Sequence, residues 1–322
     1  MEAMEVHGLN ASASHAFTSH TASASKDSEL TASIVICSRK RPNLLRECLE
    51  SVSRLHPAAN EIIVVDNTEG DKATELIAEQ FKARYIVEPE PGLSRARNSG
   101  LIASTSEIVA YLDDDARPQK DWLGFILQPF SEPAVASVTG DTFPAGYDDS
   151  APSHGPVRTL CNKDPKWFEI ATFGGLGYGT NMAIRKAACS GWKGFDVRLG
   201  RGAPLWLAEE SHAFASLLDL GYCAVHVPAA IVIHPMKPQD LELEASSRVA
   251  YWLLLFWEFP GHRLDLVRFL LNRLRRKRLS WPRDPQGPGE IIKSGWHIYL
   301  KAALAGTLLY LRNRKAADRN KA

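Results

Sequence analysis

Three adjacent carboxylates, Asp113, Asp114 and Asp115, carry the most distinctive chemistry in this chain. Neighbouring negative charges repel one another unless solvent or a cation offsets them. A divalent ion such as Mg²⁺ or Mn²⁺ takes oxygen ligands and can also bridge to the phosphates of a nucleotide. A solvated acidic turn is the alternative. Because the run directly follows the apolar segment 108–112, a predicted buried strand, we expect it at the edge of a sheet where ligands bind.

Asp66 follows another predicted strand, residues 61–65, and should reach the same edge of the sheet. An ionised carboxylate there can accept a hydrogen bond from the ring N–H of a nucleobase or from a ribose hydroxyl. It could equally cap the turn at residues 68–70, as Asp commonly does. The residues alone leave both interpretations open.

Cationic side chains accompany these carboxylates. The donors that follow the predicted strand at 33–37 are Ser38, Arg39 and Arg41. They either hold a diphosphate or are plain surface charge. Arg97 and Asn98 lie in the first turn of a helix that Ser94 is placed to cap. A helix N-terminus with an arginine beside it suits phosphate oxygens, so we expect both residues to contact a donor.

The elements that position these residues follow from hydrophobic periodicity. Short apolar segments predict strands at residues 33–37, 61–65, 84–87 and 108–112. Spacings of three and four predict helices at residues 42–55, 73–81, 94–104 and 122–130. Continuous apolar strands separated by helices predict an α/β fold, with a mostly parallel sheet that helices cover on both faces.

The second half of the chain is less regular. Residues 141–172 lack periodicity and predict an irregular segment, after which we expect a helix at 208–220 and strands at 222–227 and 231–234. About the last 75 residues are helical in pattern and basic. The predicted organisation is a disordered tail at 1–30, an α/β domain at 31–240 and a helical C-terminal region at 241–322.

Eight segments in their order resemble glycosyltransferase family 2 enzymes of the GT-A (Rossmann-like) fold. They are VICSRKRP, EIIVVDN, EPGLSRARNSG, VAYLDDDARPQKDWL, GYGTNMAIRK, GFDVRLGRG, LAEESHAF and IVIHP. The resemblance covers about residues 32–236. It implies a nucleotide-sugar-dependent transferase that uses Mg²⁺ or Mn²⁺ and inverts the anomeric carbon. Polysaccharide or glycolipid assembly is the implied setting.

The resemblance also assigns roles to residues. Asp66 would contact the base, and Asp113 the ribose or a metal-bound water. Asp115 would be the direct metal ligand, with Asp114 as its substitute, and His234 would complete the metal site or contact the diphosphate. Considered without the family, His234 is a histidine at a strand end. Lys40 departs from the pattern, because many relatives carry Asn there.

Glu209 and Glu210 stand where relatives have Glu-Asp, and both lie in the first turn of a predicted helix, whose dipole favours the ionised form. Steps of three, four and seven from Glu210 reach an apolar face, whereas those from Glu209 reach a more polar one. Glu210 should therefore face the cleft and act as the general base, while Glu209 could hold a sugar hydroxyl. Two solvated glutamates at a helix start are the alternative.

Rival functions remain. A sugar nucleotidyltransferase needs a glycine-rich loop after its first strand, where this chain has Ser-Arg-Lys-Arg-Pro. A non-catalytic nucleotide-sugar-binding subunit would not need both an acidic run and a base. A retaining transferase stays open, because spacing does not reveal stereochemistry. The favoured donor is a UDP-sugar, since Asp66 suits the ring N–H of uracil, but thymine and guanine also offer such a donor and the base stays open. The acceptor is a carbohydrate or a lipid-linked sugar.

The composition of the C-terminal region indicates where in the cell the protein acts. From residue 261 onward there are 15 Lys and Arg against 4 Asp and Glu. Residues 262–279 read as a basic amphipathic helix, which can lie in a membrane interface or pack on the core. Nucleic-acid binding is not expected, because no recognition fold accompanies the charge.

Five scattered cysteines without a C-x-x-C pair predict no disulfide framework and favour a reducing compartment. We therefore expect a cytoplasmic protein, peripheral on the inner face of the membrane.

Overall fold

The computed structural model describes residues 30–146, 155–235, 241–276 and 296–319. Its strands are β1 (Ala32–Ser38), β2 (Glu61–Asp66), β3 (Arg84–Val87), β4 (Ile108–Asp113), β5 (Arg117–Pro118), β6 (Val135–Phe143), β7 (Arg158–Cys161), β8 (Met182–Arg185) and β9 (Cys223–Ile233). Its α-helices are α1 (Pro42–Val52), α2 (Lys72–Gln80), α3 (Leu93–Ala103), α4 (Trp122–Leu127), α5 (Trp167–Thr172), α6 (Glu209–Asp219), α7 (Leu241–Glu258), α8 (Arg263–Arg276) and α9 (Trp296–Arg319). The disordered tail predicted at 1–30 falls almost entirely outside the described residues.

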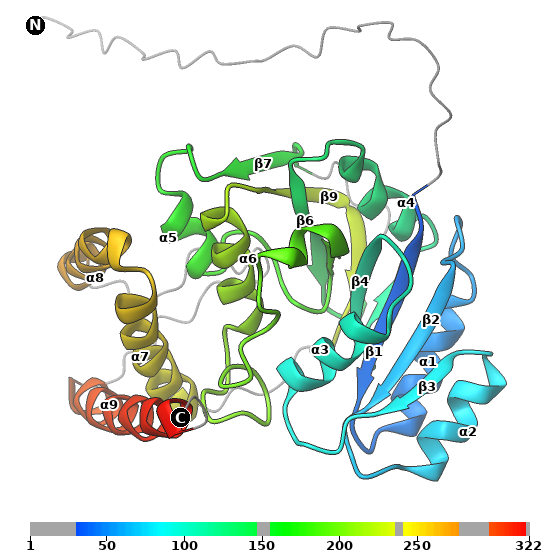
Figure 1. Cartoon of the computed structure of the whole chain (residues 1–322), viewed down its shortest axis with the longest axis horizontal. Helices are drawn as coiled ribbons and strands as arrows, with labels where there is room; N and C mark the ends of the chain where they lie inside the picture. Colours follow the sequence, from blue (N-terminus) through cyan, green and yellow to red (C-terminus); the bar gives the residue numbers. More distant parts are fainter. Residues whose placement is uncertain (1–29, 147–154, 236–240, 277–295, 320–322) are drawn as a thin grey trace, which may run out of the picture.

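The strands form a mixed sheet in the order β3-β2-β1-β4-β8-β6-β9-β5, and β7 pairs with β9 beside this path (Figure 1). The four predicted N-terminal strands are confirmed and pair in parallel. Strand β8 runs antiparallel to both β4 and β6, so the sheet is less parallel than its apolar strands suggested. The α/β prediction itself is confirmed.

Two hydrophobic layers cover the sheet, and alternation along the strands assigns side chains to them. On β1, Ile34 and Ile36 pack in the layer that contains α1, α2 and α4. Val35 packs in the opposite layer with α3, α5, α6 and α7. Helix α3 lies close to the sheet at Gly100, where an added Cβ would come within 2.3 Å of Val35. Glycine at this position therefore sets the distance between α3 and β1.

Strand β9 is continuous, so the prediction of two strands at 222–227 and 231–234 was wrong. The pairing with β6 shifts register between Gly140 and Thr142, and Pro228 lies opposite this irregularity. Proline has no N–H to donate, and a bulge is one of the few places in a sheet that tolerates it. An added Cβ on Gly140 would meet the carbonyl oxygen of Ala230 at 1.9 Å, so only glycine permits this approach.

The segment predicted to be irregular, 141–172, contains the end of β6, the short β7 and α5. Residues 147–154 lie outside the described residues. Strand β7 has four residues with two exposed side chains, Arg158 and Thr159, and α5 has six residues. Elements this short do not complete enough periods to be recognised in the sequence.

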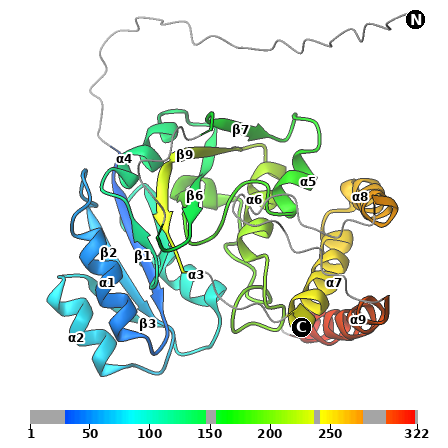
Figure 2. The same ribbon diagram turned by 180° about the vertical axis from the view of Figure 1, so that it is seen from behind.

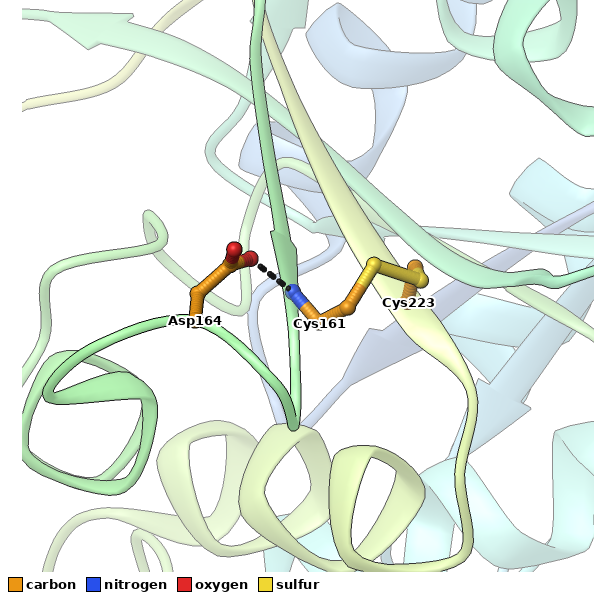
Figure 3. The surroundings of a disulfide bond; sticks show 3 residues. All are labelled: Cys161, Asp164 and Cys223. Atoms are coloured by element: carbon orange, nitrogen blue, oxygen red, sulfur yellow. Dashed lines mark hydrogen bonds between the residues drawn. A yellow bond between two sulfur atoms is a disulfide. The ribbon is translucent and has the colours of Figure 1, made fainter.

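Cys161 and Cys223 face each other across the β7–β9 pair and form a disulfide (Figure 3). The expectation that the cysteines form no disulfide was therefore wrong. The partners are 62 residues apart and adjacent only through strand pairing, so no local spacing announces them. The Asp164 carboxylate accepts a hydrogen bond from the Cys161 N–H at 2.7 Å and fixes the turn beside the bond. Disulfides are rare in reducing compartments, so this bond does not support the reducing compartment that the sequence predicted.

The C-terminal helices gather on the side of the molecule away from β1, β2 and β3 (Figures 1 and 2). Helix α7 packs on the core, because its Tyr251 and Leu254 are buried in the same layer as Phe214 of α6. Helix α8 confirms the predicted amphipathic helix up to Arg276, and residues 277–279 lie outside the described part. Among the described residues, no helix has both the length and the apolarity needed to cross a bilayer.

The disulfide predicts a measurable contribution to stability. Replacing both Cys161 and Cys223 by serine should lower the free energy of unfolding by about 2–4 kcal/mol, because the bond closes a long loop in the unfolded chain. Urea unfolding with and without reductant measures this. Cys189→Ser, which removes a free and half-buried thiol and keeps the bond, is the matched control and should respond to reductant as the parent protein does, whereas the double serine variant should not. Five reactive thiols in unfolded, unreduced protein would contradict the bond.

Candidate active site

Parallel pairing brings the ends of three strands to one edge of the sheet. Ser38 at the end of β1 pairs with Asp66 at the end of β2, and Cys37 pairs with Asp113 at the end of β4. The residues that sequence reasoning placed beyond the strand ends therefore do share an edge, as expected for a sheet of this kind.

Asp114 is fully buried and is held by two groups from the β1–α1 loop. Arg41 Nη2 lies 2.5 Å from Asp114 Oδ1, and the Ser38 hydroxyl donates to Oδ2 at 2.8 Å. Burial raises the pKa of Asp114 to about 6, against the opposing charge of Arg41. Lys40, just before Arg41, has a φ of 56°, a left-handed conformation that Asn adopts more readily than Lys. Asn, which the family resemblance leads us to expect at the position of Lys40, would fit this conformation.

His234 lies beside the three aspartates because the short strand β5 begins two residues after Asp115. Arg117 of β5 pairs with Ile233 of β9, so the turn before β5 lies beside the residue after β9. His234 Nε2 is 3.0 Å from Asp115 Oδ1 and 3.5 Å from Asp113 Oδ2. Burial disfavours the charged imidazole, but hydrogen bonds and attraction from the two carboxylates outweigh it and raise the pKa of His234 to about 9.

Asp113, Asp115 and His234 have the chemistry of a divalent-cation site. Two carboxylate oxygens and one imidazole nitrogen lie within 4.8 Å of one another. Carboxylates suit Mg²⁺ and Mn²⁺, and an imidazole is accepted by transition ions. The described residues contain a second such group, Asp196, His212 and Glu258, but there Arg198 forms ion pairs with both carboxylates and already offsets their charge.

Arg97 is buried and forms an ion pair network of its own. Its Nη1 donates to Glu209 Oε1 at 2.9 Å, and its Nη2 lies 3.5 Å from Asp113 Oδ1. An added Cβ on Gly179 would come within 2.6 Å of the guanidinium, so the glycine-rich turn makes room for it. The expected polar face of Glu209 was wrong, because this side chain is buried against Arg97. The helical periodicity did not predict the surroundings of Glu209, because most of α6 is buried, including Ser211 and His212.

Glu210 borders a different space, a cavity of about 320 Å³. Its lining also includes Gly174, Gly177, Tyr178, Arg201, Trp206, Glu244 and Arg248. Ala208, the N-cap residue of α6, has a φ of 71°, so the chain turns sharply just before the two glutamates. Burial and the neighbouring charge of Glu209 raise the pKa of Glu210 to about 8. A carboxylate with a pKa near neutrality is suited to proton transfer.

A larger cavity of about 510 Å³ opens at the strand edge itself. Its polar lining residues are Ser38, Arg39, Arg41, Asn67, Asp113, Arg201 and Trp206. Sequence reasoning did not single out Arg201 or Trp206, which line both cavities. Arg201 lies in the family-like segment GFDVRLGRG, between two glycines that both adopt positive φ, and this segment was the local signal that could have found it.

Two other residues that were predicted to contact the donor, Asp66 and Asn98, do not line this cavity. Asp66 has no exposed surface, and its carboxylate accepts hydrogen bonds from Thr68, Tyr85 and the Asp71 N–H. The Asn98 amide bonds both backbone groups of Phe195 and anchors that loop.

Ser94 does not cap α3. Its hydroxyl donates to the Leu199 carbonyl, and Gly92 stands at the N-cap position. Like Asn98, Ser94 therefore holds the loop that leads to Arg201.

Comparison with known proteins agrees with this geometry. The model of "Glycosyl transferase family 2" matches residues 33–191. Succinoglycan biosynthesis protein ExoM of Rhizobium meliloti is 29% identical over 221 residues, which is 65% of this chain and 68% of the relative. Glycosyltransferase AglE of Haloferax volcanii is 33% identical over 236 residues, which is 70% of this chain and 73% of the relative.

A solved structure shows the same fold. The mannosyltransferase PcManGT of Pyrobaculum calidifontis, in complex with GDP-Man and Mn²⁺, matches with a TM-score of 0.51 at 16% identity, covering 86% of this chain and 74% of that one. The chain thus has the GT-A architecture of such transferases. Together with the sequence relatives, this establishes that the chain is a member of glycosyl transferase family 2.

Proposed function

We propose that this glycosyltransferase moves a sugar from a nucleoside-diphosphate donor in the 510 Å³ cavity to an acceptor hydroxyl in the 320 Å³ cavity. One observation carries the proposal: the two cavities meet at Arg201 and Trp206, with Asp113 bordering the first and Glu210 the second. A candidate metal-binding group and a candidate base thus lie in neighbouring cavities, on either side of the residues that both cavities share. The work of the enzyme would be the assembly of a polysaccharide or a glycolipid.

In the proposed reaction Glu210 takes the proton of the acceptor hydroxyl, and the oxygen attacks the anomeric carbon while the bond to the diphosphate oxygen breaks. Attack from the side opposite the leaving group inverts the anomeric centre. A divalent cation bound by Asp113, Asp115 and His234 would supply positive charge for the departing diphosphate. Arg39 lines the same cavity and adds a further cation.

The nucleotide base is proposed to be uracil, with Asp66 accepting from the ring N–H. Because the Asp66 carboxylate is bonded by Thr68 and Tyr85, binding would require one of these hydrogen bonds to be exchanged. Asn98 and Glu209 are proposed to act indirectly, through the Phe195 loop and through Arg97.

Peripheral binding at the inner face of the cytoplasmic membrane is proposed for α8. Its Leu264 is 69% exposed and its Leu271 48% exposed, and Arg268 is also exposed on the same helix. Apolar side chains interspersed with cations suit an interface of anionic lipids.

Glu210→Gln should retain donor binding and lose transfer by about 10²–10⁴-fold, because glutamine cannot accept the hydroxyl proton. In the parent protein transfer should fall as the pH drops below about 8, since the raised pKa of Glu210 leaves less of the ionised base. Single-turnover product formation measures both. Asp219→Asn, at the exposed end of α6, is the matched control. Undiminished transfer by Glu210→Gln, with chemistry limiting, would remove the assignment.

Transfer should stop with chelator and return with Mn²⁺ or Mg²⁺. A panel of UDP- and GDP-sugars, scored for release of nucleoside diphosphate, tests this together with the choice of base. Asp115→Asn should weaken Mn²⁺ binding at least tenfold in titration calorimetry, because it removes an anionic ligand. Asp265→Asn, an exposed carboxylate on α8, should leave Mn²⁺ binding unchanged. Full activity in chelator would refute the proposed metal dependence.

The protein should sediment with vesicles rich in phosphatidylglycerol at low salt and be released at high salt, since surface charges are screened by salt. The double variant Leu264→Glu, Leu271→Glu should remain in the supernatant. Ile102→Glu, at a still more exposed apolar position on α3, is the control and should still sediment. Lack of sedimentation by the parent protein would rule out the membrane contact.

A further inference from the structure

The guanidinium of Arg41 spans two of the three consecutive carboxylates. Its Nη2 lies 2.5 Å from Asp114 Oδ1, and its Nη1 lies 3.0 Å from Asp115 Oδ2. The side chains of the two aspartates are 0% and 1% exposed, whereas the Arg41 side chain is 38% exposed and lines the 510 Å³ cavity. Both terminal nitrogens of an arginine that borders the proposed donor cavity are thus engaged by buried carboxylates.

The two other cations of this cluster are less free to move. The Arg97 side chain is 3% exposed and also pairs with a buried carboxylate of α6. His234 is 17% exposed and is itself one of the three candidate metal ligands. Asp114 would keep a partner without Arg41, because the Ser38 hydroxyl donates to its other oxygen at 2.8 Å. Of the three cations, Arg41 can therefore leave with the smallest loss of contacts.

Arg41 and a divalent cation would compete for the same carboxylate. Asp115 offers Oδ2 to Arg41 and Oδ1 to His234, and it belongs to the candidate metal group. An ion held by Asp115 would stand close to the guanidinium, and like charges at short range repel one another. A diphosphate in the adjoining cavity offers a guanidinium the anionic oxygens that it binds through paired hydrogen bonds.

We propose that Arg41 is an exchangeable partner of the acidic run. It pairs with Asp114 and Asp115 until a divalent cation takes over Asp115, and it then turns to the diphosphate of the donor. This exchange rests on the proposed transferase function and adds an order to it, in which the cation prepares the cavity for the nucleotide. It also accounts for an arginine that was predicted to contact the donor and that lies on carboxylates instead.

Titration calorimetry of Mn²⁺ without nucleotide tests the first half of the exchange. Arg41→Gln should bind Mn²⁺ at least about tenfold more tightly than the parent protein, because a competing positive charge is removed. Arg39→Gln removes an equal charge from an exposed arginine of the same cavity, and as the matched control it should change the Mn²⁺ affinity by less. Arg41→Lys keeps the charge and protects folding, but its single ammonium lacks the fork that spans two carboxylates, so its affinity should be intermediate.

Titration of UDP in chelator and in saturating Mn²⁺ tests the second half. Mn²⁺ should tighten UDP binding by a factor at least about tenfold smaller in Arg41→Gln than in the parent protein, because the charged contact that the exchange releases is missing. In Arg39→Gln this factor should be unchanged, since Arg39 forms no ion pair with the described aspartates and needs no release. GDP takes the place of UDP if the parent protein binds GDP more tightly.

Mn²⁺ binding that is unchanged or weaker in both Arg41 variants would overturn the competition. An equal Mn²⁺-dependent gain in UDP affinity in Arg41→Gln and the parent protein would overturn the transfer of Arg41 to the diphosphate. Both results leave the transferase in place, provided that the parent protein binds Mn²⁺ and nucleotide. A parent protein that binds neither Mn²⁺ nor UDP or GDP would refute the proposed function itself, and the exchange with it.

Discussion

The accumulation of negative charge at the end of β4 constrains everything around it. Asp113, Asp114 and Asp115 are consecutive, and the last two are almost completely buried. Each is compensated differently: Asp114 by Arg41 and Ser38, Asp115 by Arg41 and His234, and Asp113 by Arg97 and His234. The opposing charges come from the β1–α1 loop, from α3 and from the residue after β9, so segments distant in sequence meet at one edge of the sheet. Attraction from His234 and Arg97 outweighs burial and lowers the pKa of Asp113, so this carboxylate stays ionised at the cavity wall.

Arg97 connects this cluster to the acceptor side. It contacts Asp113 at one end and Glu209 at the other, so the two regions share a single buried cation. Glu210, next to Glu209, consequently experiences a negative neighbour and a buried setting, and both raise its pKa. A displacement of α6 would break the Arg97 pair and leave a buried charge without its partner, which is strongly unfavourable. The position of the candidate base is thus tied electrostatically to the metal-binding group.

Much of this could be predicted from the sequence, and the exceptions have physical reasons. Strands β1 to β4 are continuous apolar runs, and the residues just after them did reach the same edge. The grouping of Asp113, Asp115 and His234 followed from family resemblance, because the two-residue strand β5 that brings them together leaves no periodic signal. Arg201 and Trp206 lie on a loop fixed by side chains of α3, and the Cys161–Cys223 bond depends on strand pairing, so neither could be derived from local spacing.

Strand β9 connects two features that lie far apart. At one end Cys223 is joined covalently to β7, and at the other the chain delivers His234 to the carboxylates. Eleven residues of extended chain span about 36 Å at 3.3 Å per residue, so the sulfur atoms and the imidazole occupy opposite ends of the sheet. Near the imidazole the strand is held by β5 and by the hydrogen bond from the His234 N–H to the Phe143 carbonyl. Reduction of the bond would therefore loosen the remote border of the sheet and spare the geometry of the ion-binding corner.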